Sequence, residues 1–446
     1  MLARLHKLNN PKKIVLVTFF FILVILIFKG KDFSLSEEEQ LVIFTQTDLD
    51  ETTLQLQGKK QIIDRAESEL SQKRTEVLNK ERENESQELE TDEQKTKYQE
   101  TKKEIYNAKQ EIENKEFELE ELLKVYNNEK KNLQIKTEIV QDEGKIDLVY
   151  SWAGILNDMT IRNRYNWELQ FSLRSIHKYL PWINKIYILI NTDTEPPYWL
   201  KENYPDGKII ILDRCELIDH PDYCPTYNSF AVYSVVHTIP GLSNKFILMD
   251  DDFFFNRPVG PEYMFTETGL PIVYQKFRKT PTYKSNDKLW NYIKTNGYPK
   301  WKYAKFTHIP MPLRRDLILK FDQNYPGYLD LVQSHYKKRY KKLTEEVSMI
   351  YYLYFSEKGW IKAPGQNKAK FFQTPKYHKD DITQEFETYY DIITGKKKIT
   401  FNVNDSFSKN DEIYQKQRKV LWNFYNKLYP ETPDYELPNP DHAKYS

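Results

Sequence analysis

The stretch Lys245–Phe255, which reads KFILMDDDFFF, decides the fold. Its apolar residues Phe246–Met249 run directly into three consecutive aspartates, and a short apolar run of this kind is typical of a buried strand. The sequence therefore predicts a strand with three carboxylates at its carboxyl end. Such carboxylates repel one another unless a cation or strong hydrogen-bond donors neutralise them, and their hard oxygen atoms suit Mg²⁺ or Mn²⁺. The alternative is a solvated acidic turn.

Similar apolar runs occur upstream, and a segment with helical periodicity separates the first two. The runs are IDLVYSW at 146–152, KIYILIN at 185–191 and KIIILD at 208–213. Residues 163–179 carry apolar side chains at intervals that suit an amphipathic helix. Strands that alternate with helices predict an α/β fold with a Rossmann-like, mostly parallel sheet. Ligands bind such sheets at the carboxyl ends of the strands, where the aspartates are expected.

Charge and cysteine content exclude several classes of protein. The 446 residues include 66 Lys and Arg against 65 Asp and Glu, so no global positive field favours nucleic acid as a partner. The sequence has neither G-x-G-x-x-G nor a Walker loop, which argues against a dinucleotide-binding enzyme or a P-loop kinase. Cys215 and Cys224 are too few for a disulfide scaffold or a four-cysteine zinc site, and a buried or singly bridged pair is favoured over a catalytic role.

Residues 14–28, IVLVTFFFILVILIF, form an uncharged run near the amino terminus. As a helix it spans about 22 Å, and flanking lysines can lengthen it toward the roughly 30 Å hydrocarbon core. We expect a cytosolic tail at 1–13, a signal-anchor at 14–28 and the rest of a single-pass type II membrane protein in the lumen or outside the cell. In a eukaryote this would be the Golgi or another part of the secretory pathway. A cleaved signal peptide is the alternative, but no small-x-small cleavage pattern follows.

A polar segment then leads to the folded domain. Residues 29–46 are expected to form a linker, and residues 47–140 a helical stem rich in Glu, Lys, Gln and Leu. Ile105, Ile112, Leu119, Tyr126 and Leu133 repeat every seven residues, which favours a coiled coil and a possible homodimer. A single charged helix is the alternative. About 90 residues in one helix would span roughly 135 Å.

Three polar motifs lie beyond the aspartates, and each also has an ordinary structural explanation. His308 stands in the loop sequence FTHIPMP and suits an acid, a base or a phosphate contact, although a lone loop histidine is more often surface. Asn404 and Asp405 in FNVNDSF offer oxygen ligands, but Asn-Asp is also common in turns. The basic tract KKRYKK at 337–342 can meet an anionic substrate or form a solvated helix face.

These motifs, taken in order, resemble the Stealth family, whose members include the lysosomal-enzyme N-acetylglucosamine-1-phosphotransferase α/β subunit and bacterial capsular-polysaccharide phosphotransferases. The resemblance covers about 145–438 and leaves a tail at 439–446. Its blocks are IDLVYSW at 146–152, ELQFSLRSIHKYLPWINKIYILIN at 168–191, CPTYNSFAV and HTIPGLSNKFILMDDDFFF within 224–255, HIPMPLRRDLI at 308–318, LTEEVSMIYYLY at 343–354, FNVNDSF at 401–407 and VLWNFYNKLYPETPDYELP at 420–438.

The resemblance implies a membrane-anchored transferase of polysaccharide biosynthesis, with an α/β fold related to GT-A glycosyltransferases. Such an enzyme uses Mg²⁺ or Mn²⁺ to move a sugar-1-phosphate from a nucleotide diphosphate sugar to a glycan hydroxyl. The residues that match, with the roles the family implies, are Asp252, His308, Ser229 and Lys342 as catalytic residues; Ser151, Trp152, Arg174 and Arg339 as substrate contacts; and Asp250, Asp252, Asn404 and Asp405 as metal ligands.

Two positions depart from the family pattern. Tyr233 stands where the family usually has a glutamate four residues after the serine, and a phenol is a poor replacement for a carboxylate base. Lys342 aligns with a family arginine and lacks its bidentate fork, which Arg339 supplies if the alignment shifts by three residues. These departures leave two alternatives open: a metal-dependent glycosyltransferase of ordinary type, and an inactive membrane-tethered protein that binds glycans or serves as a scaffold.

Overall fold

The chain divides into two units, Met1–Ile43 and Phe44–Ser446, and only the second contains described residues. The computed structural model describes residues 45–86, 91–152, 154, 165–201, 204, 207–218, 220–273, 277–278, 303–304, 310–324, 327–334, 361–362, 369–373, 382–395, 398–404 and 407–438. Within these ranges, no helix has the length and apolar character needed to cross a membrane. The expected anchor at 14–28 lies outside them.

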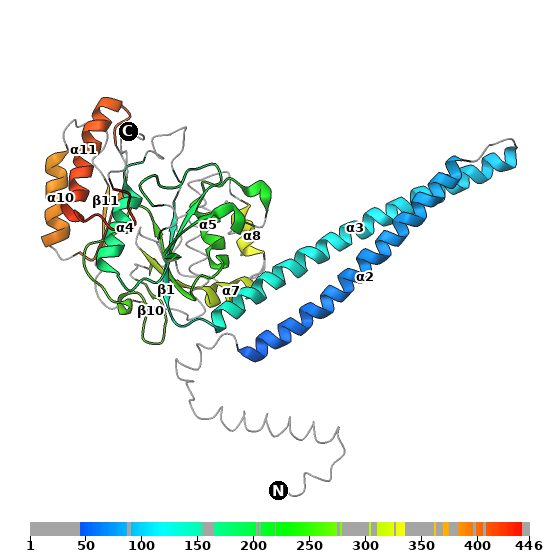
Figure 1. Cartoon of the computed structure of the whole chain (residues 1–446), viewed down its shortest axis with the longest axis horizontal. Helices are drawn as coiled ribbons and strands as arrows, with labels where there is room; N and C mark the ends of the chain where they lie inside the picture. Colours follow the sequence, from blue (N-terminus) through cyan, green and yellow to red (C-terminus); the bar gives the residue numbers. More distant parts are fainter. Residues whose placement is uncertain are drawn as a thin grey trace, which may run out of the picture. The chain divides into compact units, whose positions relative to one another are not determined.

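A five-stranded sheet forms the centre of the domain, in the order β3-β2-β1-β4-β9 (Figure 1). Four strands are parallel and β9 is antiparallel to its neighbour β4, so the predicted α/β fold with a mostly parallel sheet is confirmed. The strands are β1 Ile146–Ser151, β2 Ile186–Ile190, β3 Ile209–Asp213, β4 Lys245–Asp250 and β9 Met311–Arg314. β1 and β2 are buried along their whole length, which explains their continuous apolar sequences.

Helices and short 3₁₀ turns connect these strands. Figure 1 shows α4 on one side of the domain and α5, α7 and α8 on the other. The helices are α4 Glu168–Tyr179, α5 Ser229–Val235, α7 Arg315–Asn324 and α8 Tyr328–Gln333, and the 3₁₀ turns are Arg214–Leu217, Pro221–Tyr223, Val236–Thr238 and Pro261–Tyr263. The helix predicted within 163–179 is confirmed as α4, whose inward face is buried.

A second, smaller sheet brings the carboxyl-terminal part of the chain to the aspartates. Its order is β11-β12-β5, with β12 parallel to β11 and antiparallel to β5. The strands are β5 Phe253–Phe255, β11 Ala369–Gln373 and β12 Thr400–Asn404, and the helices that follow β11 and β12 are α10 Thr383–Gly395 and α11 Asp411–Leu428. Two-stranded pairs join β6 Ile272–Val273 to β10 Ile361–Lys362 and β7 Phe277–Arg278 to β8 Tyr303–Ala304.

The phenylalanines after the aspartates anchor this arrangement. Phe254 is fully buried and stacks on Phe401 of β12 and against Tyr425 of α11, each with ring centroids 5.0 Å apart. Tyr425 also stacks on Phe171 of α4. Truncating a buried phenylalanine to alanine costs about 3–5 kcal/mol, so this aromatic layer contributes strongly to holding the acidic turn in place.

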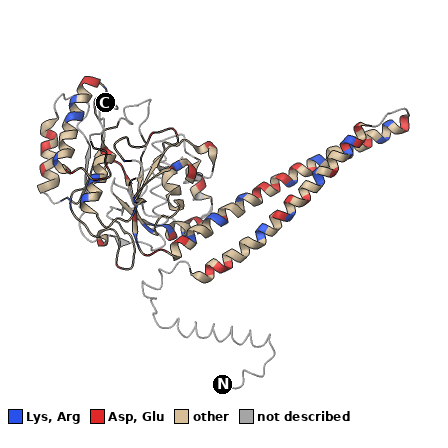
Figure 2. Cartoon of the chain, in the orientation of Figure 1, with Lys and Arg blue, Asp and Glu red and all other residues tan. Residues whose placement is uncertain are grey.

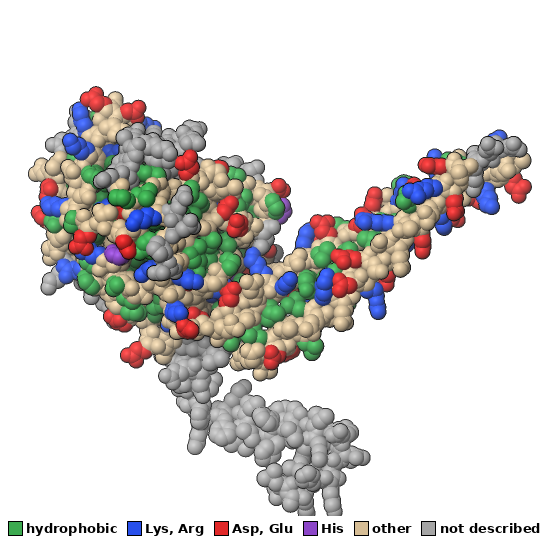
Figure 3. Space-filling view, viewed as in Figure 1, with side chains coloured by type: hydrophobic (Ala, Val, Ile, Leu, Met, Phe, Trp, Pro, Cys, Tyr) green, Lys and Arg blue, Asp and Glu red, His purple; other side chains and the backbone are tan. Residues whose placement is uncertain are grey.

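Upstream of the sheet, two long helices pair with each other. They are α2 Gln46–Glu85 and α3 Asp92–Val140, and Thr45 and Thr91 begin them with capping boxes. Ion pairs Lys59–Glu129, Lys73–Glu111 and Lys109–Glu81 join early residues of one helix to late residues of the other, so the helices run antiparallel. Figures 2 and 3 show charges of both signs interspersed along them.

The helical character predicted for 47–140 is confirmed, but the single span of roughly 135 Å is wrong, because the chain folds back between α2 and α3. The heptad series in α3 packs against a matching series in α2, and Ile105 and Ile112 contact Leu70 and Val77. The buried residues of α2 are Leu49, Leu56, Ile63, Leu70, Val77 and Asn84, which also recur every seven positions. The buried apolar series of α3 therefore packs against α2 of the same chain. The homodimer stays a prediction.

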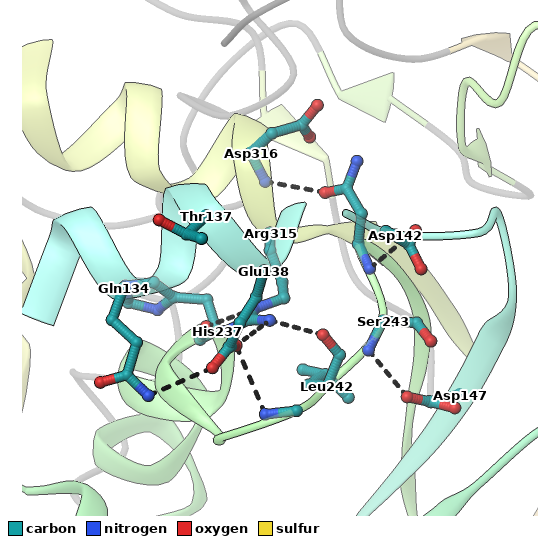
Figure 4. A network of polar contacts seen from close by, with 12 residues as sticks. Gln134, Thr137, Glu138, Asp142, Asp147, His237, Leu242, Ser243, Arg315 and Asp316 are labelled. Carbon is teal, nitrogen blue, oxygen red and sulfur yellow. Dashed lines mark hydrogen bonds and ion pairs between the residues drawn. The ribbon is translucent and has the colours of Figure 1, made fainter. Parts of the chain in front are cut away.

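The end of α3 is built into the domain (Figure 4). Arg315, at the start of α7, is fully buried and donates to Glu138 of α3 at 2.8 Å and to the carbonyl oxygen of His237 at 2.8 Å. Asp142 accepts a hydrogen bond from the backbone nitrogen of Asn244 at 3.3 Å. The packing of the domain therefore begins before the expected boundary at residue 145.

Candidate active site

The carboxyl ends of the parallel strands meet at one edge of the sheet, as in other open α/β sheets. Ser151, the last residue of β1, pairs directly with Asp250, the last residue of β4. Trp152 follows β1, is 3% exposed, and packs edge-on against Tyr165. Ser151 and Trp152, two of the predicted substrate contacts, therefore lie beside the strand that carries the aspartates.

β12 approaches the acidic turn from the second sheet. The backbone nitrogen of Val403 donates to the carbonyl oxygen of Asp252 at 3.2 Å, and Asn402 pairs with Phe253. Asn404 is the last residue of β12, one position after Val403. Two motifs about 150 residues apart in sequence are thus brought together, as the interpretation of Asn404 as a site residue requires.

The environment of this turn disfavours three ionised carboxylates side by side. Loss of solvation raises the pKa of Asp252 well above its usual value, and the charges of Asp250 and Asp251 raise it further. The nearby amide of Asn402 acts in the opposite direction. Asn402 is 1% exposed, and among the described residues neither of its amide atoms has a partner with hydrogen-bond geometry. The sequence analysis selected Asn404 and Asp405 from this motif and missed Asn402.

α5 supplies a hydrogen-bond donor to the same turn. Tyr233, which is 8% exposed, donates from its hydroxyl group to Oδ1 of Asp250. Ser229, the first residue of α5, is half-buried and precedes Tyr233 by four positions, so both side chains project from the same face of the helix. The contact of Tyr233 with Asp250 therefore turns the face that carries Ser229 toward the acidic turn.

A buried guanidinium lies close to these groups, and the sequence analysis did not identify it. Arg214 is 2% exposed and donates to the backbone carbonyl oxygens of Trp152, Leu189 and Thr226, with the Leu189 contact at 2.7 Å. Burial lowers its pKa to about 10, while Asp213, Tyr227, Tyr233 and Asp251 act in the opposite direction. Arg214 therefore places a fixed positive charge at the carboxyl edge of the sheet. Its position directly after a predicted strand was the available signal.

The loop after β3 completes this edge. Cys215 and Cys224 form a disulfide, which confirms the bridged pair as one of the two structural possibilities. Asn191, after β2, accepts a hydrogen bond from the backbone nitrogen of Thr226 at 3.2 Å. Tyr227 is 38% exposed and donates to Asp193 at 2.5 Å, so its ring is held at the surface beside the strand ends.

Other predicted site residues lie elsewhere or outside the described ranges. Arg174 of α4 is buried and bonds Glu436 through Nε at 2.6 Å and Nη2 at 2.7 Å, with Nη1 on the carbonyl oxygen of Tyr429. This engagement gives Arg174 a structural role, and we leave it out of the substrate site. The residues outside the described ranges are His308, Arg339, Lys342 and Asp405, and the side chain of Asn404 is not described either.

The acidic turn offers carboxylate oxygens as potential metal ligands. In the part of the chain that the structure describes, no group of three or more His, Cys, Asp and Glu side chains is arranged to hold a metal ion. Of the predicted ligands, only Asp250 and Asp252 have described side chains. The oxygen-rich turn and the unpartnered amide of Asn402 beside it nevertheless fit a hard divalent cation in chemical type.

Part of the chain is similar to known proteins. Residues 162–273, which include α5 and the aspartates, match the family model for Stealth protein conserved region 2. An exopolysaccharide phosphotransferase of Streptomyces coelicolor is 26% identical over 60% of this chain and 49% of its own length. A capsular polysaccharide phosphotransferase of Haemophilus influenzae is 29% identical over 58% of this chain and 71% of its own length.

A third relative, a capsular polysaccharide phosphotransferase of Neisseria meningitidis, is 40% identical over 26% of this chain and 31% of its own length. The matched region and these relatives together show that part of the chain is similar to Stealth proteins and to polysaccharide phosphotransferases. The chain spans about half the length of the Streptomyces relative, at 49%.

Among solved structures, the galactosyltransferase LgtC in complex with donor and acceptor sugar analogues has a TM-score of 0.34 and 10% identity. The alignment covers 65% of this chain and 98% of that one. This similarity is too low to identify site residues. The relation to GT-A glycosyltransferases stays a prediction.

Proposed function

We propose that the protein transfers a sugar-1-phosphate from a nucleotide diphosphate sugar to a glycan hydroxyl, with Mg²⁺ or Mn²⁺ as cofactor. One structural observation carries the proposal. The strand β4 ends at Asp250, the first of three consecutive aspartates at the carboxyl edge of a parallel sheet, and β12 approaches them from a distant part of the chain. The phosphotransferase names of the relatives support the reaction class.

Asp250 and Asp252 would hold the cation, together with Asn404 and Asp405. A cation there would supply positive charge against the diphosphate and against the charge that develops on the leaving nucleotide. The raised pKa of Asp252 supports this role, because a carboxylate that is poorly solvated and surrounded by like charges gains most from a cation. Arg214 adds a positive charge that is fixed in the same region.

The roles of the other candidate site residues are those that the resemblance to the Stealth family implies. His308 would accept the proton of the acceptor hydroxyl, whose oxygen then attacks the phosphorus that carries the sugar. The bond from that phosphorus to the bridging oxygen breaks, and a nucleoside monophosphate leaves. Ser229, with Lys342 or Arg339, would contact the phosphates, and Ser151 and Trp152 would contact the donor. A single-pass anchor at residues 14–28 would place this chemistry in the lumen or outside the cell.

The identity of the released nucleotide tests the proposal. The full chain in detergent is incubated with Mn²⁺ or Mg²⁺, a panel of nucleotide sugars and a mixture of glycan acceptors, and nucleotide products are separated. We expect metal-dependent release of nucleoside monophosphate that Asp252→Ala abolishes. Asp64→Ala, on the exposed part of α2, is the matched control and should release nucleotide at the wild-type rate.

Two results would contradict the proposal. Release of nucleoside diphosphate would instead indicate an ordinary metal-dependent glycosyltransferase. Absence of release, from a protein that demonstrably binds nucleotide sugars, would favour a glycan-binding or scaffolding role.

A further inference from the structure

The hydrogen bond from Tyr233 to Asp250 joins a helix to the acidic turn. α5 packs against β1 and α8, so its position is set by the body of the domain and not by the turn itself. The Tyr233 ring is nearly buried, and its hydroxyl group donates to Oδ1 of Asp250. The phenol therefore restricts the rotation of a carboxylate that has Asp251 and Asp252 as its immediate neighbours.

A neutral donor has a different electrostatic effect here from a cationic one. A phenol donates a hydrogen bond to Asp250 and adds no net positive charge. A lysine or arginine in the same place would neutralise the carboxylate and compete with a bound cation. The turn thus keeps its negative charge while one of its carboxylates is held in a fixed orientation.

We propose that Tyr233 is a positioning residue that fixes the carboxylate of Asp250 for binding of a divalent cation at the acidic turn. The proposal rests on the proposed function and extends it to the residue that orients one metal ligand. Partners that orient metal ligands through hydrogen bonds commonly change metal affinity or activity by about 10- to 100-fold when they are removed. Tyr233 acts through Asp250 and need not touch the substrate.

Tyr233→Phe removes only the hydroxyl group and keeps the buried ring. The free Mn²⁺ signal is followed by electron paramagnetic resonance during titration of the full chain in detergent. We expect Mn²⁺ to bind about 10- to 100-fold more weakly to Tyr233→Phe than to the wild type. In turnover assays the Mn²⁺ concentration for half-maximal rate should rise by a similar factor, while the rate at saturating Mn²⁺ falls much less.

Tyr187→Phe provides the matched control. Tyr187 is 1% exposed and donates from its hydroxyl group to the carbonyl oxygen of Gly241 at 3.0 Å, so the substitution removes the same atom and one hydrogen bond. Gly241 precedes β4, whereas the aspartates end that strand, so Mn²⁺ affinity should equal that of the wild type. In an Asp250→Asn background, Tyr233→Phe should have little further effect, because the oriented carboxylate is already gone.

The possible outcomes separate this proposal from the proposed function. Wild-type affinity in Tyr233→Phe, or an equal loss in Tyr187→Phe, would overturn the role of Tyr233 alone. A wild-type chain that binds no Mn²⁺ would overturn both the role of Tyr233 and the metal-dependent reaction. A chain whose Mn²⁺ affinity falls in Tyr233→Phe as expected, but which releases no nucleoside monophosphate, would contradict the reaction and leave the positioning role supported.

Discussion

Glu138 of α3 accepts a hydrogen bond at 2.8 Å from Nη1 of Arg315, a residue that is fully buried in the domain. The same carboxylate accepts a hydrogen bond from the backbone nitrogen of Gly241 at 3.3 Å, in the loop that leads into β4. The helical hairpin therefore ends as a structural part of the domain, and Glu138 balances a charge that no solvent reaches.

Replacement of Glu138 by alanine should destabilise the protein markedly. Breaking a buried ion pair leaves an uncompensated charge and costs about 3–5 kcal/mol. Because the Glu138 side chain is 25% exposed, we expect about 2–3 kcal/mol in urea unfolding monitored by tryptophan fluorescence, since every tryptophan lies at or beyond Trp152. Glu116→Ala, which removes the more exposed pair with Arg74, should cost less than about 1 kcal/mol. Equal losses in the two variants would contradict the structural role of Glu138.

His237 should make the domain sensitive to mild acid. Burial, with the positive charges of Arg315 and Lys131 nearby, lowers its pKa to about 3, against about 6.5 for an unfolded chain. The unfolded state therefore binds a proton first, and stability is lost as the pH falls from about 6.5 toward 3. Between pH 7.5 and 5.0 this one group should cost about 2 kcal/mol in urea unfolding.

His237→Gln removes the titrating group and should flatten that pH dependence. The exposed His220, with its side chain at 57% exposure, supplies the control, because His220→Gln should retain the wild-type slope. An unchanged slope in His237→Gln would show that other groups cause the loss at acid pH.

The pairing of α2 with α3 predicts a cross-link within one chain. Lys59 and Glu129 form an ion pair across the hairpin, so cysteines introduced at both positions should be joined within one chain by a short bismaleimide cross-linker. Non-reducing electrophoresis should then give a faster-migrating monomer, because the native cysteines are already bridged to each other. Cross-linked dimers as the main product would instead support the homodimer expected from the heptad series.

Replacement of Asn402 should lower the transfer activity while leaving the stability of the protein nearly unchanged. Its buried amide lies beside Asp252, whose pKa it lowers, but has no partner at good hydrogen-bond geometry among the described residues, so replacing it by an apolar group of similar shape should cost little stability. Asn402→Leu should therefore unfold within about 1 kcal/mol of the wild type. Transfer should fall at least about 10-fold, as expected for loss of a group beside a metal ligand. A variant with both wild-type stability and wild-type activity would remove Asn402 from the site.

The sequence predicted those features of the fold and site that depend on local pattern. Apolar runs identified β1, β2, β3 and β4, and the position of Asp250–Asp252 directly after such a run indicated where the site lies. Arg214, Asn402 and the pair Glu138–Arg315 were missed, because their roles depend on contacts between distant segments. The fold-back of α2 onto α3 could have been predicted from the heptad repeat in α2, which mirrors that of α3.

Transfer of the phosphate together with the sugar is the central claim, and one labelling measurement tests it directly. The full chain is incubated with Mn²⁺, a glycan acceptor and a nucleotide diphosphate sugar that carries ³²P only in the phosphate attached to the sugar. The account predicts that the label moves to the glycan and that Asp252→Ala prevents this transfer. Label that stays in released nucleoside diphosphate, while unlabelled sugar joins the glycan, would contradict it.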